Sequence, residues 1–195
     1  MAITNGYATL AEFKLWIDDS SSDSDDDGVI EDIIEASSRW IDDETGRTFY
    51  ARTETRYYDV PDGRKLKLDD DLLTITAITN GDGASIDDSS EIDLVPKNTA
   101  PYYAIRIKAG SSYYWTQDSS GNVEDVISIA GTWGYAATTP HDIRQACLLI
   151  ANNMYKKRHG EGEQGATLTA AGVVLSAAGI PSQAKMILRR YKRLT

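Results

Sequence analysis

Apolar residues recur at helical spacing near both ends of this 195-residue chain, roughly over residues 9–45 and again over 140–193. The stretch between them alternates short runs of β-branched and aromatic residues with tight turns, which is the pattern of strands. We therefore expect the two helical segments to pack together, with a strand-rich lobe inserted between them. Such a plan suits a protein that makes contacts with other macromolecules.

The first helical stretch carries clear start and stop signals. Thr9, followed three residues later by Glu12, is a capping-box pattern and predicts a short helix. A polar, acidic loop covers residues 18–28, and a second helix is expected to begin near Asp27. Gly46 is expected to close that helix as its C-cap.

The middle of the chain, from Arg47 to about Tyr135, predicts strands. Residues 61–63 and 80–83 have the composition of turns. The predicted strands are residues 48–50, 53–60, 65–68, 72–79, 92–95, 102–108 and 126–133. A small antiparallel sheet or barrel is the expected result.

The last part of the chain returns to helical periodicity. Thr139 and Pro140 mark the start of the longest helix, which ends before Gly160. Residues 160–179 are rich in Gly and Ala and are expected to be mobile. Residues 180–182 open a final helix.

These elements predict an α+β fold, in which a small helical bundle formed by the N- and C-terminal helices carries an inserted antiparallel β lobe. Three parts are expected. They are an N-terminal helical part over 1–51, the β lobe over 52–135, and a C-terminal helical part over 136–195 that packs on the first.

Charge changes this picture because it is distributed unevenly. The net charge is −10, but the chain from residue 156 onward holds eight basic and two acidic residues, or +6, which leaves −16 before it. A basic end of this kind is expected to dock on an acidic surface, while the acidic body repels nucleic acid. A solvated basic helix end is the alternative interpretation.

Cys147 is the only cysteine, so no internal disulfide can form and a reducing compartment is expected. It falls in the apolar stripe of the third helix, which indicates a core residue rather than a nucleophile. No apolar run reaches the length of a membrane span, and the first residues lack the pattern of a secretory signal. Synthesis in the cytosol is therefore expected.

The acidic loop contains the incomplete beginning of a calcium-binding loop. Asp23, Asp25 and Asp27, followed by Gly28, match the first half of an EF-hand loop. Its twelfth position, which should supply a bidentate glutamate, is Ile34. We therefore interpret the loop as an acidic cap on the second helix and expect no cofactor and no metal, with these three aspartates as the remaining cation candidates.

The other chemical signals have structural interpretations. Residues 69–71 are three consecutive aspartates, which we expect in a solvated turn. Residues 160–165 match a dinucleotide-binding pattern in letters only, because they follow a helix rather than a strand. His141 and His159 lie at opposite ends of the third helix, too far apart for a shared site. The residues show no active site, so the protein is predicted not to be an enzyme.

The order of the motifs resembles the head–tail connector (head-completion or adaptor) proteins of tailed bacteriophages. The resemblance rests on residues 7–14 (YATLAEFK), 33–42 (IIEASSRWID), 45–49 (TGRTF), 131–135 (GTWGY), then Pro140, Ile143, Ala146 and residues 155–158 (YKKR). Short members of that family lack most of the strand-rich block, so residues 52–130 look like the inserted lobe of a longer variant.

This resemblance implies a ring of subunits beneath the portal, with twelvefold symmetry in the virion. DNA would pass through the channel without sequence-specific binding, and tail-completion or tail proteins would bind the far side. The virion's head–tail junction is the implied location, after assembly in the host cytoplasm. The basic end would dock on the portal, through Lys185, Arg189, Arg190, Lys192 and Arg193.

Two other hypotheses stay open at the level of sequence. One is a non-viral protein-binding module whose β lobe contacts a partner. The other is a metal-dependent enzyme that uses Asp23, Asp25 and Asp27, or residues 69–71.

Overall fold

The computed structural model describes residues 3–19, 24–86, 90–158, 166–169, 172–175 and 180–193. The chain forms two compact units, one of Met1–Gly46 with Thr139–Thr195 and the other of Arg47–Thr138. We call them the helical unit and the β unit. Four helices and a five-stranded antiparallel sheet make the protein α+β, which confirms the predicted class.

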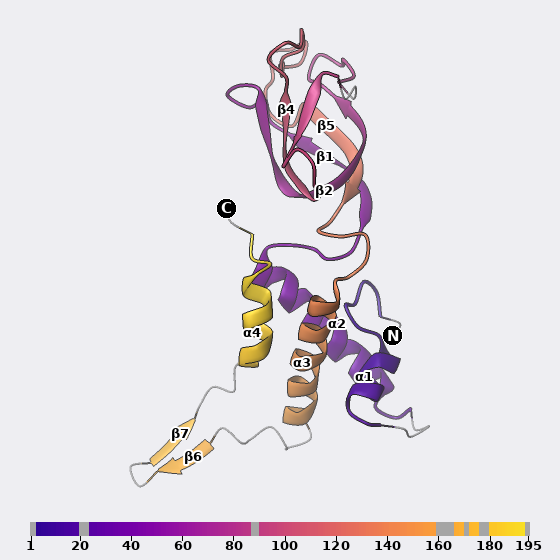
Figure 1. Cartoon of the computed structure of the whole chain (residues 1–195), viewed down its shortest axis with the longest axis vertical. Coiled ribbons are helices and arrows are strands. Elements are labelled where there is room, and N and C mark those ends of the chain that lie inside the picture. The colour runs from indigo at the N-terminus through magenta and orange to yellow at the C-terminus, as the bar shows by residue number, and fades with distance from the viewer. Residues whose placement is uncertain are drawn as a thin grey trace. The chain divides into compact units, whose positions relative to one another are not determined.

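The helical unit consists of α1 (Leu10–Trp16), α2 (Asp27–Thr45), α3 (His141–Arg158) and α4 (Ser182–Arg189). Figure 1 shows α3 beside α4, and both helices also contact α2. Segments from opposite ends of the chain thus share one bundle. No helix in the described part of the chain is long and apolar enough to cross a membrane.

The helix ends follow the predicted signals. The Thr9 hydroxyl accepts a hydrogen bond from the Glu12 amide at 3.2 Å, and the Glu12 carboxylate accepts one from the Thr9 amide at 2.8 Å. Gly46 ends α2 with φ of 64°, a left-handed conformation that glycine adopts without steric cost. Both predictions are confirmed.

The core of the helical unit joins all four helices. The Tyr7 amide donates to the Ser38 hydroxyl at 2.9 Å, and that hydroxyl lies 3.5 Å from the Cys147 sulfur. The rings of Phe13 and Tyr155 pack edge to face at 5.7 Å. The fully buried apolar side chains of this unit include Phe13, Ile34, Ile41, Ile143, Ile150 and Ala184.

The β unit is a single sheet. Its strands are β1 (Arg52–Tyr58), β2 (Lys65–Thr79), β3 (Ile92–Val95), β4 (Tyr102–Ile107) and β5 (Ile127–Trp133). They lie in the order β1-β5-β2-β4-β3, and every neighbouring pair is antiparallel. Among the described residues β1 and β3 do not pair with each other, so the sheet is open rather than a closed barrel.

One face of this sheet holds a continuous apolar core. Its central members are fully buried and come from β2, β4, β5 and the connection between β2 and β3. They include Leu68, Leu72, Ile78, Ile86, Ile105, Ile107, Ile129 and Trp133.

The interpretation of residues 69–71 as a solvated turn is wrong. The predicted strands 65–68 and 72–79 form one continuous strand, β2, which runs through all three aspartates. The pairing of β2 with β4 is irregular between Lys67 and Leu72, so the usual alternation of faces is lost. Asp70 and Asp71 are consequently both buried. Residues 48–50, also predicted as a strand, form none.

Arginines from β1 and the segment before it neutralise the buried carboxylates. Asp71 pairs with Arg47 at 2.5 Å, and Asp70 pairs with Arg52 at 2.5 Å and with Arg56 at 2.9 Å. Each of these arginines also lies over an aromatic ring. Asp70 and Asp71, which are neighbours in the sequence, therefore form a network of ion pairs with arginines of β1 and of the segment before it.

Asp69 and Tyr58 complete this network at its edge. The Tyr58 hydroxyl donates to Asp69 at 2.5 Å, and Arg56 pairs with the same carboxylate at 2.9 Å. Partial burial raises the pKa of Asp69, but the hydrogen bonds from Tyr58 and Arg56 outweigh it and leave the pKa below its ordinary value. Burial, together with the Asp69 charge, raises the pKa of Tyr58. The carboxylate therefore stays ionised and the phenol stays protonated.

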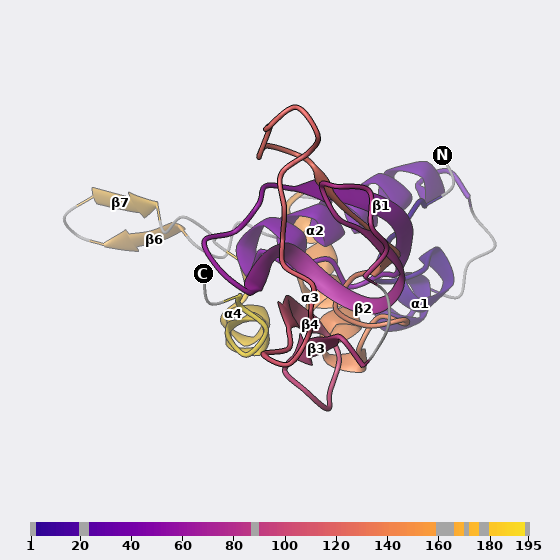
Figure 2. The ribbon, with the colours of Figure 1, turned by 90° about the horizontal axis from the view of Figure 1, so that it is seen from above.

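Two further strands lie between α3 and α4, where the sequence predicted only a mobile segment. They are β6 (Ala166–Thr169) and β7 (Gly172–Leu175), which pair antiparallel and are drawn side by side in Figures 1 and 2. The hairpin belongs to the helical unit.

Candidate docking surface

Helix α4 presents the predicted basic residues on a scaffold held by α3 and α2. Ala184 and Leu188, four residues apart, are buried against the bundle. The helix is therefore amphipathic, and the residues on its other side face solvent. Lys185, Arg189, Arg190 and Lys192 are all exposed.

Three of the five predicted docking residues fasten the end of the chain to the bundle. Arg190 pairs with Asp142 at the start of α3 at 2.5 Å, and Lys192 lies 3.3 Å from Glu44 near the end of α2. The Arg193 amide donates to the Thr45 carbonyl at 2.8 Å. The side chains of Arg190 and Lys192 are mostly exposed, so each ion pair contributes little energy, but together these contacts join the segment after α4 to α2 and α3.

The other two, Lys185 and Arg189, form a basic surface with Met186. They are one helical turn apart and so lie on the same side of α4, next to the buried side formed by Ala184 and Leu188. Among the described residues neither has an ion-pair partner. The side chain of Met186, which lies beside them on the helix, is 67% exposed. Two open cations beside an exposed thioether form a surface suited to an acidic partner. We call Lys185, Met186 and Arg189 the α4 face.

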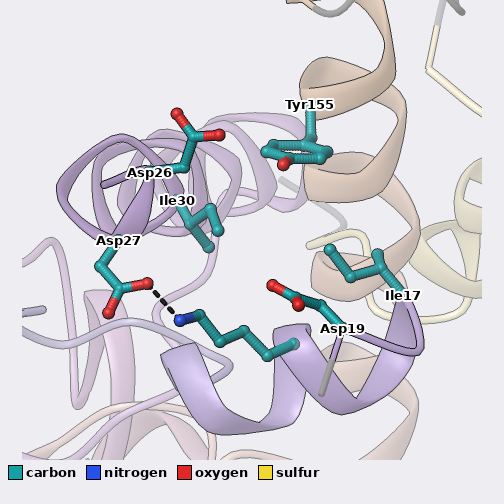
Figure 3. Close-up of a pocket in the computed structure, with 7 residues that line it drawn as sticks. Ile17, Asp19, Asp26, Asp27, Ile30 and Tyr155 are labelled. Atoms are coloured by element: carbon teal, nitrogen blue, oxygen red, sulfur yellow. Dashed lines mark ion pairs between the residues drawn. The ribbon is translucent and has the colours of Figure 1, made fainter. Parts of the chain in front are cut away.

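The acidic loop borders a separate pocket of about 300 Å³ in the helical unit. Figure 3 shows Asp19, Asp26, Asp27 and Tyr155 around it. Lys14 from α1 forms an ion pair with Asp27 inside the pocket. Burial raises the pKa of Tyr155, and the charges of Asp26 and Asp19 raise it further. The pocket therefore holds a cation of its own, a lysine side chain.

Asp25 and Asp27 are the two cation candidates that the structure describes. Asp23 lies outside the described residues, and Asp27 is engaged by Lys14. No cluster of three or more His, Cys, Asp or Glu side chains in the described part of the chain is arranged to hold a metal ion. The structure also gives no such cluster at residues 69–71, whose carboxylates face arginines.

Of the two histidines, the structure describes His141, whose contact is within its own helix. His141 lies at the start of α3 and contacts Arg144. His159 and the dinucleotide-like residues 160–165 lie outside the described residues. Arg144 in turn pairs with Glu12 of the capping box at 2.7 Å, which joins α3 to α1.

Cys147 is buried in the bundle, and burial raises the pKa of its thiol to about 11. Because the thiolate is the reactive form, alkylation of the native protein at neutral pH should be about 100-fold or more slower than in denaturant. Mass spectrometry after timed iodoacetamide treatment measures both rates. Rapid labelling of the native protein would contradict the buried placement.

Sequence reasoning identified the five basic residues but did not show that three of them contact the bundle while Lys185 and Arg189 face solvent. Glu44 and Asp142, which hold the end of the chain, lie far from Arg190 and Lys192 in sequence, and nothing local marks them as partners. Met186 was also missed. Its signal was available, because an apolar residue next to Lys185 lies outside the stripe formed by Ala184 and Leu188.

Comparison with known proteins identifies a family whose model matches nearly the whole chain. A family model described as "Head completion protein" matches residues 7–194. No curated protein matches the chain. The family model therefore covers both units and all four helices.

Solved structures with a similar fold come from gene transfer agent (GTA) particles. One is "Neck of empty GTA particle computed with C6 symmetry", with 19% identity, a TM-score of 0.60, and coverage of 100% of this chain and 94% of that chain. Another is "Neck of native GTA particle computed with C12 symmetry", with 19% identity, a TM-score of 0.60, and coverage of 100% and 93%. A third, "Virion of native gene transfer agent (GTA) particle", has 20% identity, a TM-score of 0.59, and coverage of 100% and 94%. At this identity these likenesses show a shared fold.

Proposed function

The chain belongs to the head completion protein family, and from this premise we propose that it is a structural head–tail connector of a tailed phage, prophage or related particle. In this role copies assemble as a ring beneath the portal. The ring joins capsid to tail and lets DNA pass through its channel. The protein acts at the head–tail junction of the virion, after assembly in the host cytoplasm.

The match of the family model over residues 7–194 is the observation that carries this proposal. The neck structures that share the fold support a ring, because they were computed with C6 and C12 symmetry. The role requires no catalysis. The net charge of −10 suits a channel along which DNA slides without adhering.

We assign portal docking to the basic end of the chain, with the α4 face as the contacting surface. Lys185 and Arg189 supply open positive charge, and Met186 supplies an apolar contact beside them. Arg190, Lys192 and Arg193 contribute indirectly, because their contacts with Asp142, Glu44 and Thr45 hold the helix end in place. This division implies that the five basic residues are not equivalent.

Charge reversal of the α4 face tests the assignment. The double variant Lys185→Glu/Arg189→Glu should lose about tenfold or more of its affinity for the portal protein, because two attractive charges become repulsive ones. Sedimentation of mixtures with purified portal measures the affinity. The wild-type affinity should also fall as salt is added, since exposed charges are screened.

Lys65→Glu/Lys67→Glu is the matched control, with the same change in net charge on two exposed lysines of β2. It should bind the portal as the wild type does. Equal loss in both variants would mean that net charge, not the α4 face, controls docking. No loss in either would show that the portal is bound elsewhere. A wild-type chain that binds neither portal nor itself would count against the connector role.

A further inference from the structure

The hairpin of β6 and β7 lacks support from its own unit. Ala166 pairs with Leu175 and Thr169 with Gly172, so each strand has the other as its neighbour. Within the described residues neither strand contacts α1, α2, α3 or α4. A two-stranded hairpin alone is marginally stable in water. The hairpin therefore requires another surface to become a stable element.

The composition of this segment is typical of a strand that joins a sheet. Residues 164–184 contain no charged residue, although 26% of the whole chain is charged. Leu168, Val173 and Val174 lie in the paired strands and favour β structure. Native proteins keep uncharged β-forming edges covered, because such edges pair with other strands.

In the described part of the chain, the sheet of the β unit has two edge strands, β1 and β3, to which a further strand could pair. The edge at β3 is protected: the strand has four residues, Pro96 follows it, and Asp93 pairs with Arg106 at 2.8 Å. The edge at β1 has seven residues and contains no proline. Of the two edges, β1 is therefore the one open to a further strand.

The side chains of β1 also favour this strand as the one to which a further strand adds. Thr53, Thr55 and Tyr57 are exposed on one face, and the side chain of Tyr57 is 63% exposed. Arg52 and Arg56 are held internally by Asp70. The accessible face of β1 is thus uncharged and rich in residues that form favourable cross-strand pairs. In its lack of charge, this face resembles the β6–β7 hairpin.

We propose that the β6–β7 hairpin of one copy adds to strand β1 of a second copy and extends its sheet. The contact is strand addition, in which main-chain hydrogen bonds supply the affinity. It joins two different surfaces head to tail, the type of contact that closes into rings. The inference rests on the proposed ring assembly and names the surfaces that form it.

Cross-linking between variants that each carry one introduced cysteine tests the contact directly. Thr55→Cys and Val174→Cys are mixed under conditions in which the wild type assembles, and a short bifunctional maleimide is added. The native Cys147 stays silent because its thiol is buried. A covalent dimer that contains one chain of each variant is expected. Asp93→Cys on β3 replaces Thr55→Cys as the control and should give no such dimer with Val174→Cys.

Three results would overturn the proposal. One is a heterodimer that forms with Asp93→Cys and not with Thr55→Cys. Another is a cross-link that forms only within single chains of a Thr55→Cys/Val174→Cys double variant. The last is the absence of any cross-link in a sample that sedimentation shows to be assembled.

A second variant separates this inference from the ring itself. Val174→Asp should shift sedimentation toward the monomer by weakening assembly about tenfold or more, whereas Val123→Asp, at an exposed valine of the β unit, should assemble normally. If both assemble as the wild type does, the hairpin contact is wrong while the ring proposal stands. A wild type that remains monomeric even with portal present would overturn both.

Discussion

Replacing Asp70 by alanine is expected to lower the free energy of unfolding of the β unit by about 3 kcal/mol. The carboxylate is the shared partner of Arg52 and Arg56, and its side chain is only 11% exposed. Its removal leaves two guanidinium groups facing each other without the intervening negative charge. Arg56 would retain its ion pairs with Asp69 and Glu54, but the remaining ion-pair contact of Arg52 would be the one with Glu54 at 4.0 Å. Repulsion between the two guanidinium groups and their incomplete solvation then both destabilise the β unit.

Hydrogen–deuterium exchange of β1, β2 and β5 peptides during urea unfolding measures the change in this unit alone. Asp62→Ala is the matched control, because Asp62 is exposed in the turn before β2 and has no partner in the described part of the chain. It should change stability by less than about 0.5 kcal/mol. Equal exchange in Asp70→Ala and the wild type would show that the ion pairs add nothing to folding.

Local signals predicted the helices well. The capping box at Thr9 and Glu12, the glycine after Thr45 and the proline at residue 140 act through neighbouring backbone groups. Such signals lie within a few residues, so a sequence reveals them directly. The change from helical to strand periodicity near Arg47 likewise predicted the α+β class.

The errors arose where partners are distant in sequence. From sequence alone, three consecutive aspartates are expected to be solvated. In the fold, β1 and β2 both pair with β5, and Arg47, Arg52 and Arg56 lie beside the aspartates. The same holds for the basic end, because Asp142 and Glu44 are joined to it only in the folded bundle. The hairpin was missed for a different reason. Its Gly- and Ala-rich surroundings resemble a linker, and β propensity depends strongly on what a strand packs against.

Trp133→Ala is expected to cost the β unit about 4 kcal/mol, since removal of a large buried aromatic leaves a cavity. The indole is fully buried, lies against the Tyr58 ring at 6.3 Å, and donates from Nε1 to the Glu54 carbonyl at 3.1 Å. The Arg56 guanidinium covers its ring at 4.7 Å. One side chain thus connects the apolar core to the charged network of β1 and β2, so its loss weakens both.

Comparison of the two units makes this variant informative about domain organisation. We propose that the β unit unfolds independently, so exchange should accelerate in β1, β2 and β5 while α2 and α3 keep their protection. Trp16→Ala, at a partly exposed tryptophan of α1, is the control and should leave the sheet unchanged. Trp133→Phe should cost less than Trp133→Ala, because it keeps most of the apolar contact and loses the hydrogen bond to Glu54. Simultaneous loss of protection in α3 would show instead that the chain folds as one cooperative unit.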